Sequence, residues 1–89
     1  MPSVRFTSHL RKVVPTEAIL VEGTTLHRAL EEVFVRHPQV RSYVLDDQAR
    51  LRKHVVIFVD GARIDGGSDL QWPVRANAEI FVLQALSGG

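Results

Sequence analysis

The pattern of apolar and polar residues differs from one part of the chain to the next, and the first two patterned segments are predicted to be strands. Val4-Arg5-Phe6-Thr7 alternates between apolar and polar residues, as a strand with one buried face does. A second strand is expected at Ala18-Ile19-Leu20-Val21. The residues between them, 8–14, are expected to form a turn. The chain therefore begins with a predicted pair of strands.

A helix is predicted after Gly23-Thr24-Thr25, because apolar residues then recur at helical spacing. Thr24 or Thr25 supplies a side-chain oxygen of the kind that caps a helix N-terminus. Pro38 ends the predicted helix, since the residue before a proline disfavours helical backbone. The apolar positions of this helix are Leu26, Ala29, Leu30, Val33 and Phe34, and its outward positions are Glu31, Glu32 and Arg36.

The pattern becomes irregular over residues 40–53 and then turns strongly β-like. The β-branched run Val55-Val56-Ile57-Phe58-Val59 predicts a central strand. Asp60-Gly61 is a hairpin signal that leads into a short return strand at Ala62-Arg63-Ile64. Ile80-Phe81-Val82-Leu83 is the last predicted strand. Within the irregular stretch, the residues expected to face inward are Tyr43, Val44 and Leu45.

This order of elements predicts an α+β fold of the ubiquitin-like β-grasp type. A hairpin is followed by one main helix that packs across a mixed sheet, and the first and last long strands lie side by side and parallel. We expect residues 1–85 to form this domain and residues 86–89 to form a mobile C-terminal tail. A length of 89 residues fits a single domain.

Composition narrows the classes of function. The net charge is only +1, which gives no reason to expect nucleic-acid or anionic-membrane binding. The N-terminus lacks the apolar core of a signal peptide, and the longest apolar run is too short to span a bilayer. We therefore expect a soluble, cytoplasmic protein.

The chain offers little internal chemistry. It has no cysteine, which excludes disulfides and thiolate nucleophiles. His27 and His37 do not have the spacing of a metal-binding pair on one helix. Glu31-Glu32 and Asp46-Asp47 are sequence neighbours, which do not face each other as an acid/base pair would. We expect no bound cofactor, no metal site and no enzymatic activity of its own.

The remaining feature is the tail, Leu86-Ser87-Gly88-Gly89. Two glycines make a slender segment with few backbone restrictions, which suits threading into a narrow site. A carboxylate is ionised and unreactive at neutral pH, so its use requires activation, for example as an acyl-adenylate in a site that excludes water. Gly-Gly alone also describes a frayed terminus. The functional interpretation is favoured because a β-grasp strand leads almost directly into the glycines.

Four segments together resemble the ubiquitin-like sulfur carriers. This family includes the small subunit of molybdopterin synthase, the thiamine-pathway carrier and the carrier of a bacterial cysteine-synthesis route. The resemblance covers nearly the whole chain. It is weaker just before the last strand, where members of the family often carry a Gly-Asp pair and this chain has Arg75-Ala76-Asn77-Ala78-Glu79. The matching segments are Val4 to Phe6, Thr25 to Leu30, Val56 to Gly61 and Glu79 to Gly89.

The resemblance implies a mechanism that is centred on Gly89. A ubiquitin-activating-type enzyme would adenylate the Gly89 carboxylate with ATP and Mg²⁺, neither of which this chain itself binds. Conversion to a thiocarboxylate would follow, and a biosynthetic enzyme would accept the sulfur. Gly88 and Ser87 would give the tail its reach, and Leu86 would anchor it to partners.

Two sets of residues are candidates for docking these partners. Phe6, Phe58 and Phe81 lie on predicted strands, and some of them are expected to form an apolar sheet face, with core packing as the default for each. Trp72 is expected to pack in the core rather than to anchor an interface. The basic cluster is either a docking patch or a solvated loop; it consists of Arg50, Arg52, Lys53 and His54.

Two other functions fit the same residues. A protein modifier would use the activated tail to acylate lysines, and a β-grasp interaction module would carry the tail incidentally. The residues leave open which pathway receives the sulfur: molybdopterin, cysteine, thiamine or another.

Overall fold

The computed structural model describes residues 1–6, 17–53, 55–64 and 70–84. The expected turn at 8–14, His54 and the tail at 86–89 lie outside the described residues. Among the described residues, no helix is long and apolar enough to cross a membrane. The elements are β1 (Ser3–Phe6), β2 (Ile19–Leu20), α1 (Leu26–Arg36), α2 (Pro38–Val44), β3 (Val55–Val59), β4 (Ala62–Ile64) and β5 (Glu79–Gln84).

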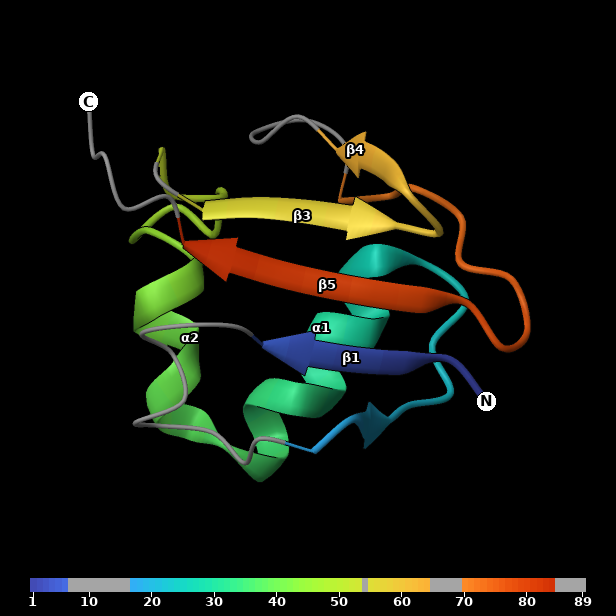
Figure 1. Ribbon diagram of the computed structural model, residues 1–89. Helices are drawn as coiled ribbons and strands as arrows, with labels where there is room; N and C mark the ends of the chain where they lie inside the picture. Colours follow the sequence, from blue (N-terminus) through green and yellow to red (C-terminus); the bar gives the residue numbers. More distant parts are fainter. Residues whose placement is uncertain (7–16, 54, 65–69, 85–89) are drawn as a thin grey trace.

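The strands form one mixed sheet in the order β2-β1-β5-β3-β4. β1 runs parallel to β5, with Val4 beside Ile80, and β3 runs antiparallel to β5, with Phe58 beside Phe81. Both helices lie on one side of this sheet (Figure 1). The predicted α+β, β-grasp architecture is confirmed, including the parallel pairing of the first and last strands.

The core lies between the sheet and the helices. In β3, the first, third and fifth residues are buried and the two between them are partly exposed, which is the alternation of a strand with one covered face. Every predicted apolar position of α1 is buried, as the helical spacing requires. The most deeply buried side chains are Val4, Val21, Leu26, Leu30, Val33, Val40, Val44, Ile57, Ile80 and Val82.

Thr25 is the residue that caps α1. Its backbone is extended, and its Oγ1 accepts a hydrogen bond from the Arg28 N–H at 3.3 Å. The N–H groups of Leu26 and His27 donate to backbone carbonyls of the 70–72 segment at 2.9 and 2.6 Å. These free N–H groups of the first turn are therefore satisfied by the protein itself.

Residues 38–44 correct the expectation of an irregular stretch. Pro38 follows the end of α1, as predicted, but it also begins α2, since its fixed φ suits the first position of a helix. Val44 and Leu45 are buried as expected. Tyr43 was expected to face inward and is 48% exposed, because neighbouring residues of a helix point in different directions.

The backbone at Gly23 and at Asn77 restricts which residue types can occupy these positions. A Cβ atom on Gly23 would lie 2.6 Å from the Ala29 amide nitrogen, so α1 packs directly against this glycine. Asn77 has a φ of 62° in the turn before β5, where the Ala78 N–H donates to the Arg75 carbonyl at 3.1 Å. Asparagine tolerates this left-handed conformation, which explains how a tight turn forms there without glycine.

Candidate partner-docking site

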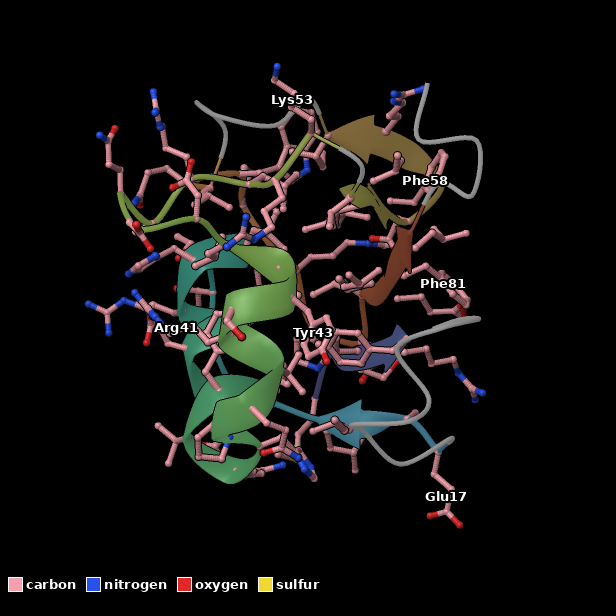
Figure 2. The ribbon with its side chains drawn as sticks, turned by 90° about the vertical axis from the view of Figure 1, so that its left-hand side faces the viewer. Glu17, Arg41, Tyr43, Lys53, Phe58 and Phe81 are labelled. Carbon is pink, nitrogen blue, oxygen red and sulfur yellow. The ribbon has the colours of Figure 1, made fainter. Side chains whose placement is uncertain are left out.

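The face of the sheet that the helices leave open carries apolar side chains from β3 and β5. Phe58 lies opposite Phe81, and Val56 lies opposite Leu83. All four side chains are partly exposed. Figure 2 shows Phe58 and Phe81 on the side of the sheet away from the helices, with Arg41 on the far side. We call these four residues the outer apolar patch.

A depression of ≈ 530 Å³ lies over this patch. Aromatic side chains that stand opposite each other on adjacent strands pack together and present a wide apolar surface. A shallow apolar depression of this kind suits a protruding side chain of another protein better than a small polar ligand. It is lined by Phe58, Asp60, Gly61, Glu79, Phe81 and Leu83.

The structure brings together two of the three phenylalanines predicted to dock partners. Phe58 and Phe81 lie on the open face, whereas Phe6 is only 4% exposed and belongs to the core. Phe6 takes the core position that was the default expectation, because β1 places its even-numbered residues toward the helices and Arg5 outward. Val56 and Leu83 were not predicted, although period-two alternation from Phe58 and Phe81 identifies both.

Asp60 closes one end of the depression. It has a φ of 50° and Gly61 a φ of 86°, so both central residues of the predicted hairpin are left-handed. The Asp60 carboxylate accepts hydrogen bonds from the Glu79 N–H at 3.0 Å and the Arg75 Nε at 2.9 Å. The Glu79 N–H and then the Arg75 side chain hold the pKa of Asp60 below its usual range. Asp60 thereby ties the β3–β4 hairpin to the start of β5.

The basic cluster serves in part to brace the loop between α2 and β3. Arg50 lies 3.7 Å from the Asp46 carboxylate, and the Arg52 Nε donates to the Ser42 carbonyl at 2.7 Å. Lys53 is exposed and forms no ion pair with the described residues (Figure 2). The cluster is therefore divided, with the arginines supporting the loop and Lys53 facing outward.

Asp46 organises the same loop from its other end. Its Oδ1 accepts hydrogen bonds from the Arg50 N–H at 3.0 Å and the Gln48 N–H at 2.8 Å. The hydrogen bond from the Arg50 N–H, followed by that from the Gln48 N–H, holds the pKa of Asp46 below its usual range. Val55, which follows the loop, pairs with Gln84, the last residue of β5. The loop therefore lies beside the point where the chain leaves the sheet.

Comparison with known proteins supplies the family. The ThiS family matches the chain over residues 4–89. The chain belongs to the ThiS family. This membership confirms the resemblance to ubiquitin-like sulfur carriers, and a search of curated proteins found no match.

Solved structures agree with this ThiS-family fold. The chain is 19% identical to a chain of the Amycolatopsis orientalis BexX/CysO complex, with a TM-score of 0.86 and complete coverage of both chains. It is 23% identical to SAMP1 from Haloferax volcanii, with a TM-score of 0.80 and 99% and 98% of the two chains covered. CysO from Mycobacterium tuberculosis, described as an antigen, is 16% identical, with a TM-score of 0.84 and 97% and 100% covered. At these identities the likeness establishes the fold.

The tail of this ThiS-family chain lies beyond the described part. β5 ends at Gln84, and the predicted tail residues Leu86, Ser87, Gly88 and Gly89 follow it in the sequence. Among the described residues, no group of three or more His, Cys, Asp or Glu side chains could hold a metal ion.

Trp72 corrects a further expectation. It is 37% exposed rather than buried in the core. It borders a notch of ≈ 430 Å³ beside the β3–β4 turn, together with Ala62 and Pro73. The segment of Trp72 is held by backbone hydrogen bonds to the start of α1, and this leaves part of the indole at the surface.

Proposed function

We propose that this ThiS-family chain is a sulfur carrier that reacts through the carboxylate of Gly89. The family match carries the proposal, because it covers residues 4–89 and so includes Gly88-Gly89. The position of β5 supports it further. This central strand ends at Gln84, and a short segment with Gly88-Gly89 follows.

The proposed reaction has two steps. The Gly89 carboxylate attacks the α-phosphorus of ATP on a ubiquitin-activating-type enzyme, which yields an acyl-adenylate and releases pyrophosphate. Hydrosulfide then attacks the acyl carbon and displaces AMP, and loss of the remaining sulfur-bound proton leaves a thiocarboxylate. The partner supplies ATP and Mg²⁺, and this chain is the macromolecular substrate rather than the catalyst. Because the chemistry consumes ATP, we infer a cytoplasmic location.

The two parts of the molecule would divide the work. The outer apolar patch, with Phe58 and Phe81, docks the head of the carrier on the activating enzyme. Leu86 then anchors the tail to the partner, and the small residues Ser87 and Gly88 lead Gly89 into the enzyme's nucleotide site with little steric conflict. A biosynthetic enzyme that accepts the sulfur uses the same tail.

Intact-mass spectrometry tests the proposal. The chain is incubated with the ubiquitin-activating-type enzyme from the same genome, ATP, Mg²⁺ and a sulfide source. The expected product has the mass increase of one oxygen replaced by sulfur. A variant that lacks Gly89 is the matched control and is expected to stay unmodified. An unmodified full chain, under conditions that convert a known carrier, would contradict the proposal.

A second candidate is a protein modifier that acylates lysines with the same activated tail. The likeness to small archaeal modifier protein 1 from Haloferax volcanii favours it. Immunoblotting of cells that express the tagged chain distinguishes it, because a modifier produces higher-mass conjugates that require Gly89. Deletion of Gly88-Gly89 would leave a simple interaction module functional and would abolish either tail-dependent function.

A further inference from the structure

A row of four side chains crosses the outer face of the sheet at one level. Arg5 of β1 lies beside Phe81 of β5, which lies beside Phe58 of β3, which lies beside Arg63 of β4. Residues paired in register share one face of a sheet, so these four side chains stand on the open side. The outer apolar patch is therefore flanked on both sides by an arginine.

These two arginines differ from most others in the described part of the chain. Arg5 and Arg63 are exposed and make no hydrogen bond or ion pair with any described residue. Five other described arginines are engaged: Arg36 and Arg52 with backbone carbonyls, and Arg41, Arg50 and Arg75 with carboxylates. Arg28, on α1, is like Arg5 and Arg63 in making no side-chain contact of this kind with the described residues. Within the described part of the chain, the cations beside the aromatic pair therefore have no charge partner.

Among the residues that the structure describes, the acidic groups of this face lie at one end of it. Glu79 precedes Phe81 by two residues on β5, and Asp60 is already paired with Arg75. The charge pattern is therefore positive across the middle of the face and negative where β5 begins. Such a pattern has a direction, so it can fix the orientation of a partner as well as attract it.

We propose that the outer face recognises an apolar ridge bordered on both sides by carboxylates, on the activating enzyme. The proposal rests on the proposed function for the choice of partner. The strands of Arg5 and Arg63 lie about 14 Å apart, given the usual spacing of neighbouring strands, so carboxylates that contact both arginines flank a ridge of about that width. Arginine and aromatic residues are the types that dominate interface energies, and the guanidinium matches a carboxylate with two parallel hydrogen bonds.

Calorimetric titration of the full chain into the ubiquitin-activating-type enzyme from the same genome, without ATP, tests the docking alone. The variants are Arg5→Glu and Arg63→Glu, and the control is Arg28→Glu, which makes the same charge change on α1, away from this face. Each outer-face variant is expected to weaken binding about tenfold or more, because it places like charges together. Arg28→Glu is expected to stay within about twofold, since its effect acts only through net charge.

Milder variants and added salt separate a local contact from a folding defect. Arg5→Gln and Arg63→Gln remove the charge without reversing it and are expected to weaken binding less than the glutamates do. Arg63→Lys is expected to recover part of the affinity. Raising the salt concentration is expected to weaken the wild-type complex more than that of the Arg5→Glu, Arg63→Glu double variant. Thermal unfolding of every variant checks that the fold is retained.

The outcomes distinguish this inference from the function on which it rests. Equal losses for Arg28→Glu and Arg63→Glu, or no loss for either outer-face variant, would overturn the arginine-flanked surface even if Gly89 is adenylated. Undetectable binding of the wild-type chain would overturn it as well. Binding with the expected arginine dependence, but no adenylation once ATP is added, would support the surface and reject the sulfur-carrier proposal.

Discussion

The two faces of the sheet use the same strands in opposite ways. In β3, Ile57 is fully buried against the helices, while its neighbour Phe58 is partly exposed on the outer patch. In β5, Ile80 and Phe81 make the same contrast. In these two strands, aliphatic side chains fill the covered face, and an aromatic pair flanked by arginines occupies the open one. Successive residues of one strand therefore have different roles: one stabilises the domain, and the next belongs to the proposed recognition surface.

The largest effect is expected on the covered face. Ile57→Ala removes a fully buried side chain and leaves a cavity, so the free energy of unfolding should fall by about 2–5 kcal/mol. Urea denaturation measures this change. A loss much below 1 kcal/mol would mean that the covered face is not the main source of stability and would weaken the contrast between the faces.

Gly23→Ala tests how closely α1 packs against the backbone of Gly23. The new Cβ atom would lie 2.6 Å from the Ala29 amide nitrogen, a backbone atom that cannot rotate away. We expect a loss of about 1–3 kcal/mol in the free energy of unfolding, typical of overpacking. Thr24→Ala, at the exposed neighbouring position, is the control and should change stability much less. Equal losses of stability for Gly23→Ala and Thr24→Ala would argue against a steric origin of the Gly23→Ala effect.

Phe81→Ser tests whether the open face of the sheet serves recognition more than stability. Its side chain is only partly buried, so we expect the cross-strand contribution of about 0.2–1 kcal/mol to be lost from folding stability. Formation of the thiocarboxylate should fall much more, because the proposed docking surface is broken. Phe6→Ser, at a buried position of β1, should instead destabilise the fold severely. A Phe81→Ser variant with normal activation kinetics would contradict the docking role.

The smallest effect is expected at Asp60, at the rim of the open face. Its pKa is lowered by folding, so its ionised form stabilises the native state above its ordinary pKa of 3.8, and this contribution disappears as pH falls through the folded value. Asp60→Asn keeps an acceptor and tolerates the left-handed turn, but it loses the charge. The variant should be less stable than wild type at pH 7, and the difference should shrink below pH 3.8.

Thermal unfolding as a function of pH measures this difference. Asp47→Asn is the control, because Asp47 makes no hydrogen bond or ion pair with the described residues. A gap between wild type and Asp60→Asn that does not change with pH would show that the Asp60 charge does not stabilise the hairpin.

Helix α2 was not predicted from the sequence, and its composition explains why. Residues 38–44 form a helix of only seven residues, and Val40 and Val44 are poor intrinsic helix formers. Its stability comes mainly from the core, in which Val40 and Val44 are fully buried. Contacts with α1 add to it, since Arg41 pairs with Glu31 at 3.1 Å and lies over the Phe34 ring at 5.8 Å. Such contacts join residues that are distant in sequence, so local spacing gave no sign of them.

The composition of the docking surface was predictable only in part. Alternation alone places Val56 with Phe58 and Phe81 with Leu83, because each pair lies on one strand. Whether β1 adds Phe6 or Arg5 to that face depends on the register between β1 and β5, which no local pattern states. The same register decides that the aromatic pair has arginines on both sides.

Local signals in the sequence were enough to predict α1 and the β3–β4 hairpin. The helical spacing from Leu26, a threonine cap at Thr24 or Thr25, and the Asp60-Gly61 turn each depend on residues within a few positions of one another. The tertiary structure decided which strands lie side by side, that Gly23 must admit α1, and that Trp72 is partly exposed rather than buried. These features arise from packing between distant segments, whose relative positions are set only when the whole core forms.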